Sequence, residues 1–543
     1  MSAPDGGVAV GGAGMRAVIL VGLMGAGKSE VGRALARRLG WPFVDTDAEI
    51  ETREQRSIAT IFRESGEPYF REVERAVLRD VARGTPTVIA TGGGVVLSST
   101  SRQLLRRVGS VFYLRAPLDV LLERVGDDPG RPLLGDDPHG ALRRLHDERA
   151  GFYEQVGTPV DAAQPIDGVV DAILTHLAEA RQRVGVGVRS RPYDIWIGSG
   201  ALALIGFDLR RLGARGRVAI VTDSRLAKRF GGSVRAVLED GGFAVQVVAV
   251  PPGERAKSMR GASTVIDALA AFGLGRQDTV AALGGGVIGD LAGFVAGTYM
   301  RGVRLVQLPT TLLAQIDSSI GGKTAVNHPR AKNLIGLVHQ PALVVADIDT
   351  LRSLPARERR AGMAEVVKYG MVLDGGLFDL LERQHAAPGR AWSPPQLTQI
   401  VARCAALKAR VVEEDEFERG PREVLNYGHT VGHAVEVAAR GRYVHGEAVA
   451  IGMRVEGQIA RRLGLLSGDD AYRQDALLEM LGLPSFVPAG AVEPLLDAMR
   501  LDKKARDGRI RCTLPEGIGR ARLGVDVPDA LMQEVVVACQ ESA

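Results

Sequence analysis

Cysteine is scarce in this sequence. Only three cysteines occur among the 543 residues, at positions 404, 512 and 539, and none has a second cysteine nearby in a CxxC spacing. This scarcity excludes a disulfide framework and a zinc site built from cysteines, and it favours a reducing cytoplasm.

Long hydrophobic runs are absent as well. No uninterrupted apolar stretch approaches the ~20 residues that a membrane-spanning helix needs. Residues 1–14 are rich in glycine and alanine, and they lack the basic segment and apolar core of a signal peptide. We therefore expect a flexible N-terminal extension and no association with a membrane.

Neither sign of charge dominates. The 68 Lys and Arg residues against 64 Asp and Glu residues leave a net charge of +4, with no concentrated basic tail, so a nucleic-acid role is not implied. Small anionic substrates would account for local clusters of cationic side chains. With 45% hydrophobic and 24% charged residues the chain is typical of a globular protein, and its length predicts two or more domains.

The first chemical motif follows a β-branched run at residues 16–21. Residues 22–29 read GLMGAGKS, which fits the pattern GxxxxGK[ST]. Amides of such a loop cradle phosphates, the lysine neutralises them and the hydroxyl ligates magnesium. A glycine turn with a solvated lysine is the plainer alternative. The residues predicted to bind nucleotide phosphate are Gly22, Gly25, Ala26, Gly27, Lys28 and Ser29.

Carboxylates and arginines follow at the ends of later strands. Asp45 and Asp47 come after a short strand, where one can serve magnesium and the other a substrate hydroxyl, unless they only cap the next helix. Arg71 lies in a helical pattern, and a third strand runs into TGGG at residues 91–94. Arg131 lies between Asp/Gly-rich flanks typical of a mobile lid, and Arg149 lies on a helix.

At this point residues 15–178 resemble shikimate kinase through GLMGAGKS, DTD, FRE, TGGG, RPLL and ERAGFY. The resemblance implies ATP with magnesium held through Ser29 and Asp45. It places shikimate hydroxyls on Asp47 and Gly93, with Asp47 accepting the hydroxyl proton. It also places the shikimate carboxylate on Arg71 and Arg149, Arg131 over the phosphates, and Arg124 near the adenine.

Two features qualify this resemblance. Glu30 replaces the second hydroxyl that usually follows the lysine and serine, and we expect only a slight effect on nucleotide contacts. Gluconate-type and adenylate-type kinases share the phosphate loop. The paired arginines, DTD and TGGG favour a small cyclic acid, because two guanidinium groups suit one carboxylate.

The second half is organised around residues 283–333. An apolar run at 279–283 feeds three glycines, which let the backbone approach a pyrophosphate near a helix start. Such a turn alone is often a plain loop. Here it is followed by polar residues in a glycine-rich frame, which predicts a cleft for a cofactor and a small anionic, polyhydroxylated ligand: Asp290, Arg301, Asp317, Lys323, Lys332 and Asn333.

A metal site is predicted further along the chain. Glu365 lies in GMAEVVKYG, His429 and His433 lie four apart on one helix face in NYGHTVGH, and His445 begins HGE. One carboxylate with two imidazoles and open positions is a recurring catalytic zinc arrangement, although any one of these histidines could be structural. We assign Glu365, His429 and His445 as ligands and His433 to acid–base work.

Residues 193–543 resemble 3-dehydroquinate synthase through PPGERAKS, LGGGVIGD, RGVRLVQLPTTLLAQIDSSIGGKTAVN, GMAEVVKYG, NYGHTVGHA, HGEAVA and DKK at 502–504. The resemblance implies zinc, or cobalt in its place, on Glu365, His429 and His445. It implies NAD on Asp223, Glu254, Lys257, Gly285, Gly286, Gly289, Asp290, Thr310, Thr311, Lys323, Lys332, Thr350 and Ser353. It implies substrate contacts from Asp317, Lys323, Lys332, Asn333, Lys368, Lys408, Arg422, Asn426, His433, Lys503 and Lys504. It also implies a homodimer, because Arg301 would reach the neighbouring subunit's site.

These resemblances predict an α/β fold in several parts. We expect a P-loop kinase domain with a parallel sheet at 15–178, a linker at 179–192, an α/β NAD-binding domain at 193–353, and a mainly helical metal and substrate domain at 354–543. The expected reactions are ATP-dependent phosphorylation of shikimate and conversion of 3-deoxy-D-arabino-heptulosonate 7-phosphate into 3-dehydroquinate with release of phosphate. Lys28, Arg131, Asp47, Lys323, Lys368, Lys408 and His433 are the expected catalytic side chains.

Three alternatives stay open. Other sugar-phosphate cyclases and glycerol-dehydrogenase relatives are the nearest rivals for the second half, and Lys408, Arg422 and Asn426 favour an acid substrate over theirs. One half could also be a catalytically inactive binding module. The two predicted reactions are not consecutive, so direct transfer of an intermediate between the halves is not implied.

Overall fold

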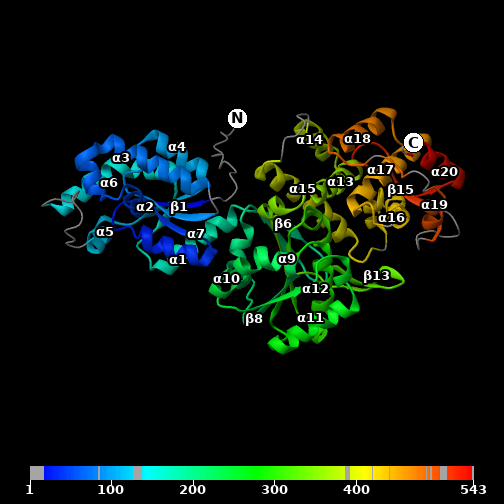
Figure 1. The fold of residues 1–543 in the computed structure, drawn as a ribbon, viewed down its shortest axis with the longest axis horizontal. Helices are drawn as coiled ribbons and strands as arrows, with labels where there is room; N and C mark the ends of the chain where they lie inside the picture. The colour runs from blue at the N-terminus through cyan, green and yellow to red at the C-terminus, as the bar shows by residue number, and fades with distance from the viewer. Residues whose placement is uncertain are drawn as a thin grey trace, which may run out of the picture. The chain divides into compact units, whose positions relative to one another are not determined.

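The computed structural model describes residues 17–83, 86–125, 137–385, 392–418, 420–439, 441–484, 486–488, 492–501 and 510–540. The chain divides into two compact units (Figure 1). The first contains residues 1–181, 198–216 and 232–245, and the second contains 182–197, 217–231 and 246–543.

The first unit is built on a five-stranded sheet in the order β2-β3-β1-β4-β5, with every neighbouring pair parallel. Its strands are buried apolar runs for the most part, as the covered faces of a parallel sheet require. This confirms the predicted parallel sheet. The strands are β1 (Ala17–Val21), β2 (Phe43–Asp45), β3 (Thr87–Ala90), β4 (Ser110–Arg115) and β5 (Thr158–Asp161).

Helices surround this sheet, as the blue and cyan part of Figure 1 shows. Besides the kinase-like region, the first unit includes two helices from later in the chain, α8 and α10, of which α10 packs on α1. The helices are α1 (Lys28–Leu39), α2 (Thr46–Glu54), α3 (Ile58–Arg83), α4 (Ser99–Val108), α5 (Leu118–Val125), α6 (Pro138–Val156), α7 (Ile166–Glu179), η1 (Ala201–Leu204), α8 (Ile205–Arg211) and α10 (Gly232–Asp240).

Helices α2 and α3 form a small core of their own beside the sheet. Ile50, Ile61, Phe70 and Val77 pack together there, apart from the main core of the unit. Helix α3 is kinked at Gly66, which has a φ of 79° and precedes Pro68. The kink is the expected consequence of a glycine and a proline within one helix, and it precedes the turn that carries Arg71.

The second unit contains a seven-stranded sheet in the order β6-β7-β14-β11-β10-β8-β9. Strands β8, β10, β11 and β14 are parallel neighbours, and helices α11 and α12 pack beside them. The elements are β6 (Gln182–Val186), β7 (Tyr193–Gly198), β8 (Arg217–Asp223), α9 (Ser224–Leu226), η2 (Ala227–Gly231), β9 (Ala244–Val250), η3 (Glu254–Ala256), α11 (Met259–Phe272), β10 (Thr279–Gly284), α12 (Gly286–Thr298), η4 (Tyr299–Arg301), β11 (Arg304–Pro309), η5 (Ala314–Ser318), β12 (Lys323–His328), β13 (Ala331–Val338), β14 (Leu343–Asp347) and η6 (Ile348–Ser353).

A mainly helical lobe follows, drawn from yellow-green to red in Figure 1, as predicted. Its elements are α13 (Ala356–Val372), α14 (Gly375–His385), α15 (Pro394–Glu414), η7 (Pro421–Asn426), α16 (His429–Ala438), α17 (His445–Arg462), α18 (Gly468–Met480), α19 (Val492–Leu501), β15 (Ile510–Pro515), β16 (Ala521–Val527) and α20 (Asp529–Ala538). One core joins this lobe to residues of β6, β7 and β14.

The linker expected at 179–192 needs correction. Strand β6 occupies part of it and pairs antiparallel with β7, with Val186 buried. The glycines and arginines of this segment hid an alternation of valines at 184, 186 and 188 that is typical of a strand. Only Ala180 and Arg181 separate α7 from β6.

Arg181 is itself buried in the first unit. Its guanidinium makes two hydrogen bonds with the Asp208 carboxylate of α8, at 2.8 and 2.7 Å, and both side chains are almost fully buried. Such a bidentate pair fixes the direction in which the chain leaves α7.

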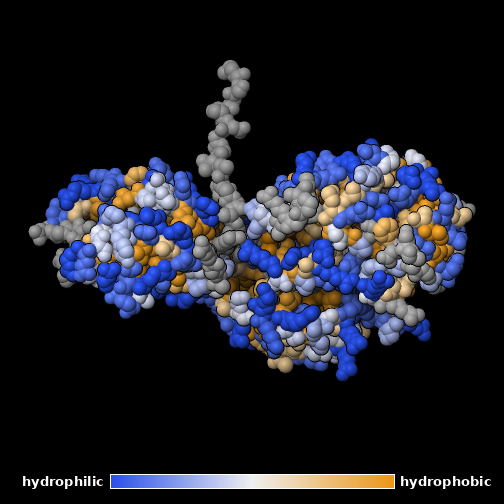
Figure 2. Space-filling model, turned by 45° about the horizontal axis from the view of Figure 1, so that its top comes forward, coloured by the Kyte–Doolittle hydropathy of each residue, from blue (hydrophilic) through white to orange (hydrophobic). Residues whose placement is uncertain are grey.

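Within the described residues no helix is long and apolar enough to cross a bilayer. Figure 2 shows hydrophilic residues over most of the visible face, and a hollow with hydrophobic walls in the second unit.

Candidate active sites

Strand β1 leads into the glycine-rich loop of the first unit. Gly25 has a φ of 79°, and a Cβ there would lie 2.8 Å from the Leu121 carbonyl oxygen, so only glycine fits. Lys28 Nζ donates to the carbonyl oxygens of Gly22 and Leu23 at 3.0 and 2.9 Å. The loop therefore wraps around the ammonium at the start of α1, where a helix N-terminus favours phosphate.

The predicted magnesium ligands lie together beside this loop. Ser29 Oγ donates to Asp45 Oδ2 at 2.5 Å, and Asp45 Oδ1 accepts from the Asp47 amide at 3.1 Å. A hydroxyl and a carboxylate in contact are oxygen ligands of the kind that magnesium prefers. The residues present therefore fit the ion that the resemblance implies.

The Asp47 carboxyl lies in an environment that raises its pKa. Burial raises the pKa of the Asp47 carboxyl above its usual value, and the negative charge of Asp45 adds to the rise, while Lys28 opposes it. A carboxylate whose proton affinity is raised is better suited to accept a proton from a substrate hydroxyl.

The three glycines after β3 bring the predicted shikimate residues together. A Cβ at Gly92 would lie 2.6 Å from Asp47 Oδ1, and one at Gly94 would lie 2.5 Å from an Arg71 nitrogen. A Cβ at Gly93 would be 3.9 Å from an Arg149 nitrogen. One carboxylate and two guanidinium groups thus converge on a stretch of backbone that has no side chains.

Three residues that we did not predict support this arrangement. Buried Glu74 pairs with the Arg71 guanidinium at 3.0 Å, as does the more exposed Glu67. Tyr153 donates to the Gly93 carbonyl oxygen at 2.5 Å and stacks on Tyr113. The spacing of Arg71 and Glu74, three apart on a helix, is a signal that the sequence offered.

Two kinase predictions are not placed at the site. Arg124 donates to the Ala162 carbonyl oxygen at 2.8 Å, in the segment after β5. Its proximity to adenine stays a prediction. Arg131 lies outside the described residues.

In the second unit, the predicted NAD residues gather at the carboxyl ends of β8, β10, β11 and β14. Asp223 ends β8 and accepts from the amides of Arg225 and Leu226 at 2.8 and 3.1 Å. Thr310 N donates to Gly284 O at 3.0 Å, which joins the β10 and β11 ends. This edge is where parallel α/β sheets bind dinucleotides. Also placed there are Gly285 and Gly286 at the start of α12, Gly289, Thr311, Thr350 and Ser353.

A polar network lies beside this edge. Lys257 pairs with Asp290 of α12 at 2.5 Å and donates to Asn333. Asn327, which we did not predict, donates to Glu254 at 2.7 Å and accepts from the Asn333 amide at 2.9 Å. The network therefore ties η3, α12 and the β12–β13 hairpin together.

The predicted metal ligands meet in the helical lobe. Nε2 of His429 and Nε2 of His445 each lie 3.5 Å from Oε1 of Glu365. Two ligands on one tetrahedral zinc are roughly 3.3 Å apart, since each lies about 2.0–2.1 Å from the metal. His429 Nδ1 donates to the Tyr427 carbonyl oxygen at 3.1 Å, which leaves Nε2 as the ligand atom.

Without an ion, the charges of this cluster favour an ionised Glu365, a neutral His429 and a protonated His445. Burial alone would raise the pKa of Glu365, but Lys368 and His429 hold it well below its usual value. Burial, helped by the charge of Lys368, holds the pKa of His429 well below its usual value, so its imidazole is neutral. Burial alone would lower the pKa of His445, but Glu365 and Glu436 raise it to about 9.

One oxygen of the buried Glu365 carboxylate lacks a hydrogen-bond donor within the described part of the chain. Glu365 is fully buried, and its Oε1 accepts no hydrogen bond from any described residue. A buried acceptor without a donor is costly unless a cation fills the gap. The three residues therefore fit a divalent metal. His433 and Glu436 form an adjoining group with His445, and the His429 and His433 rings lie edge to face at 5.3 Å.

Buried ion pairs flank the metal ligands. Lys368 pairs with Glu365, Lys408 pairs with Asp317, and the Tyr369 hydroxyl donates to Asp317 at 3.2 Å. Burial alone would raise the pKa of Asp317, yet Lys408 and Lys368 lower it to about 2. Asp317 is therefore ionised at neutral pH and fixes the Lys408 ammonium.

A cavity of about 540 Å³ in the second unit joins several of the predicted groups, because Asp290, Lys323 and Asn333 all line it. Glu418, which we did not predict, lines it too and pairs with Lys323. Burial lowers the pKa of Lys323 despite this pair. The cavity has the size and the charges of a site for a small polar ligand.

Arg422 and Asn426 belong to η7. Arg422 is buried and donates to the Glu416 carbonyl oxygen at 3.0 Å, and a Cβ at Gly321 would lie 2.7 Å from its guanidinium. Asn426 stands at the end of η7, three residues before His429. Lys332 lies exposed on β13. Lys503 and Lys504 lie outside the described residues.

Arg301 lies at the amino ends of the strands, opposite the carboxyl ends where the predicted NAD residues gather. It precedes β11, whereas Thr310 follows it, and six strand residues separate the edges by roughly 20 Å. Arg301 therefore does not reach the NAD edge of its own chain.

Glu456 is the most informative residue that sequence reasoning missed. It lies on α17, fully buried, and accepts hydrogen bonds from the Gly428 and Val431 amides at 2.6 and 3.1 Å. It thus caps the start of α16, the turn that carries His429. A carboxylate at a helix N-terminus is stabilised by the unpaired amides there.

The two sites define an enzyme with two catalytic units, a P-loop kinase followed by an α/β enzyme with a dinucleotide edge and a metal cluster. Family models agree: "Shikimate kinase" matches residues 24–178, "3-dehydroquinate synthase N-terminal" matches 247–361, and "3-dehydroquinate synthase C-terminal" matches 362–505.

Relatives give the same answer. A 3-dehydroquinate synthase of Geobacter metallireducens is 50% identical over 335 residues, which are 62% of this chain and 93% of that protein. One of Nostoc punctiforme is 44% identical over 356 residues, 65% of this chain and 98% of that protein. The chain belongs to the 3-dehydroquinate synthase family, and its first part is a shikimate kinase domain. It is therefore a multifunctional enzyme of aromatic amino acid biosynthesis.

Solved structures also resemble the second part. A 2-deoxy-scyllo-inosose synthase, complexed with carbaglucose-6-phosphate, NAD+ and Co2+, is 27% identical with a TM-score of 0.61, covering 66% of this chain and 100% of that chain. The 2-epi-5-epi-valiolone synthase of Streptomyces hygroscopicus, with NAD+ and Zn2+ bound, is 31% identical with a TM-score of 0.59, covering 64% and 96%.

Proposed function

We propose that this enzyme phosphorylates shikimate with ATP and magnesium, and converts 3-deoxy-D-arabino-heptulosonate 7-phosphate into 3-dehydroquinate with NAD and zinc or cobalt. The observation that carries the kinase reaction is the convergence of Asp47, Arg71 and Arg149 on the glycines after β3. The observation that carries the synthase reaction is the cluster of Glu365, His429 and His445.

In the kinase site, the paired guanidinium groups would hold the shikimate carboxylate, and Asp47 would orient a ring hydroxyl and accept its proton. Lys28 would neutralise phosphate charge at the start of α1. Ser29 and Asp45 would hold magnesium, which would supply positive charge against the phosphates. Positioning and charge neutralisation supply most of the catalysis in this class of reaction.

In the synthase site, NAD would lie at the edge formed by Asp223, Gly285 and Thr310. When bound, NAD accepts a hydride, and the metal on Glu365, His429 and His445 acts as a Lewis acid on an oxygen ligand. Lys323, Lys332 and Arg422 would hold the phosphate and carboxylate groups of the substrate. Lys408, fixed by Asp317, would orient it, and His433 would move a proton.

A paired assay tests both reactions in the full chain. We expect Lys28→Ala to abolish phosphorylation of shikimate and leave phosphate release from the keto-acid phosphate intact. We expect His445→Ala to do the reverse. A chain in which either substitution silences neither reaction, or in which wild-type protein turns over neither substrate, would refute the assignment.

A second candidate for the synthase part is a cyclase that makes another carbocycle. The similarity to the inosose and valiolone synthases favours it, although the identity to 3-dehydroquinate synthases is higher. Turnover of the keto-acid phosphate against glucose 6-phosphate and sedoheptulose 7-phosphate decides between them. Buried Arg422 and Lys408 predict that only the acid is converted.

We propose further that the synthase part forms a homodimer in which Arg301 serves the partner's site. This follows from its place at the edge away from its own NAD residues. Mixing Arg301→Ala and His445→Ala chains after reversible dissociation should restore about a quarter of wild-type synthase activity, because half of the dimers would contain one intact site. No recovery, with dimers present by light scattering, would contradict shared sites.

We also propose that both reactions take place in the cytoplasm. All three cysteines are buried and unpaired, which suits a reducing compartment. Recovery of the native protein in a periplasmic or membrane fraction would contradict this proposal.

A further inference from the structure

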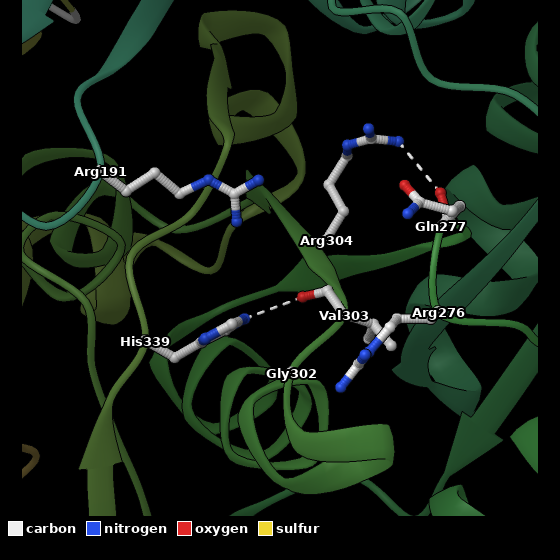
Figure 3. A pocket seen from close by; sticks show the side chains of 7 residues that line it. All are labelled: Arg191, Arg276, Gln277, Gly302, Val303, Arg304 and His339. Carbon is white, nitrogen blue, oxygen red and sulfur yellow. Dashed lines mark hydrogen bonds between the residues drawn. The ribbon is translucent and has the colours of Figure 1, made fainter.

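A cavity of about 190 Å³ in the second unit belongs to neither site described above. Figure 3 shows it between Arg191, Arg276, Arg304 and His339, with the Arg191 side chain extending toward the other residues. Three arginines from separate segments of the chain therefore line one small space, with the Arg304 guanidinium turned toward Gln277 and the Arg276 guanidinium turned the opposite way (Figure 3).

The four side chains come from the segments that lead into four adjacent strands. Arg191 precedes β7, Arg276 precedes β10, Arg304 begins β11 and His339 precedes β14. The order of these strands in the sheet is β7-β14-β11-β10. Because β10, β11 and β14 are parallel, the cavity lies at their amino ends, roughly 20 Å from the NAD edge.

The charge of the cavity is one-sided. No carboxylate is among the described residues that line it, and Arg191 makes no hydrogen bond or ion pair with any described residue. Arg276 and Arg304 donate only to the Met300 and Gln277 carbonyl oxygens and to a threonine hydroxyl, at 3.3 to 3.5 Å. Their contacts are therefore long and neutral.

Neighbouring carboxylates offset only part of this charge. Glu416 accepts hydrogen bonds from the Ser190 hydroxyl and the Gln340 side-chain amide, which are next in sequence to Arg191 and His339. Asp278 is the nearby acid that acts on Arg304, and its carboxylate already accepts from the Arg217 and Gly275 amides at 2.9 and 2.6 Å. Burial lowers the pKa of the Arg304 guanidinium, and the charge of Arg191 lowers it further. Three arginines beside carboxylates that offset only part of their charge favour the binding of an anion.

We propose that this cavity binds a small inorganic oxyanion of the phosphate or sulfate class. Planar guanidinium groups recognise tetrahedral oxyanions by paired hydrogen bonds. One water molecule takes about 30 Å³ in the liquid, so the space admits an oxyanion with some of its waters. His339 Nε2 donates to the Val303 carbonyl oxygen at 2.9 Å and forms one wall.

Anion binding here would connect the segment of Arg191 to the body of the sheet. That segment connects β6 to β7, the two strands at one edge of the sheet. None of the described side chains of the cavity lies at the NAD edge or in the metal cluster of its own chain, but Gly302, which lines it, directly follows Arg301. Failure of anion binding there would leave the proposed function untouched.

Selenate provides the direct test, because its selenium is located by anomalous diffraction. Crystals of the full chain soaked in selenate should show a peak within hydrogen-bond distance of Arg191, Arg276 or Arg304. The peak should disappear in Arg191→Gln and persist in Arg260→Gln, a matched loss of one exposed arginine on α11. A peak at the phosphate loop near Lys28 serves as the internal positive control.

Titration with inorganic phosphate gives the solution counterpart. The Arg191→Gln and Arg276→Gln chains should each bind at this site at least about tenfold more weakly, which lowers the number of sites filled per chain at a fixed concentration. A peak that persists in Arg191→Gln would overturn the proposal. So would an empty cavity beside an occupied phosphate loop, or a carboxylate of a second copy filling the cavity.

Discussion

Replacement of Glu456 by glutamine separates the metal site from the helix that supports it. The wild-type carboxylate accepts two amide hydrogen bonds at the start of α16. Glutamine keeps one acceptor oxygen but turns a donor toward the second amide. A hydrogen bond to a charged group contributes about 1.5–3 kcal/mol, and relief from burying a charge offsets part of that loss. We expect a net destabilisation of about 2 kcal/mol.

The loss should be felt at the metal, because His429 is the first residue of the helix that Glu456 caps. Substitution of a residue that orients a ligand costs about 10- to 100-fold in metal affinity. Competition for zinc with a chromophoric chelator measures this affinity, and thermal denaturation with and without zinc measures stability. Glu479→Gln is the control, since Glu479 is an exposed carboxylate paired with Arg454 at 3.3 Å.

The result that would refute this reasoning is specific. If Glu456→Gln lowered stability but bound zinc as tightly as wild type and Glu479→Gln, the cap would support the fold without positioning His429. If both quantities were unchanged, the buried carboxylate would have no energetic role at the helix start.

Three further predictions follow from the ionised groups of the two sites. Asp47→Asn should lower kinase turnover by at least about 100-fold. Because burial raises the pKa of Asp47, its ionised form costs stability as pH rises, so the variant should melt higher than wild type at pH 7 but not at about pH 3; equal melting shifts at both pH values would contradict this. Asp317→Asn should lose about 3–5 kcal/mol at pH 7, because Lys408 is left buried without its partner. Since the pKa of Asp317 is lowered to about 2, the wild-type advantage should fade as pH drops from about 4 to about 2, and an advantage that persists at pH 2 in denaturation curves would be inconsistent. Arg71→Lys should raise KM for shikimate at least about tenfold with little change in KM for ATP, because lysine cannot form paired bonds to a carboxylate; Arg63→Lys, on the exposed side of α3, is the control.

Local motifs carried most of the site predictions. The phosphate loop, the pair Asp45 and Asp47, and the two histidines of α16 were predictable, because each is set by spacing within one strand end or one helical turn. The predicted parallel sheet and the helical lobe were confirmed for the same reason: their apolar periodicities are local.

Contacts between distant segments were not predictable in this way. Glu456 meets the start of α16 from a position 25 residues beyond Val431, and no local pattern marks a buried acid as a cap. Glu418 pairs with Lys323 across 95 residues. Strand β6 was missed for a different reason, because two glycines and several arginines masked its alternating valines.

The cavity lined by Arg191, Arg276 and Arg304 shows the same limit more clearly. Arg191 and Arg304 lie more than 100 residues apart in sequence, and only the order of strands in the sheet brings them together. Arginines before strands are common and individually uninformative. Their meaning depends on which strands are neighbours, and a single sequence does not state that.

The bidentate pair between Arg181 and Asp208 bears on how such an enzyme could be divided. A cut after residue 178, where the kinase motifs end, would keep Arg181 and Asp208 together on the second fragment, but it would separate α8 and α10 from the rest of the first unit, including α1, on which α10 packs. The boundary between the two structural units therefore does not coincide with the boundary between the kinase and synthase motifs. An engineer who wants the kinase alone would first have to redesign the surface of α1 that α10 covers.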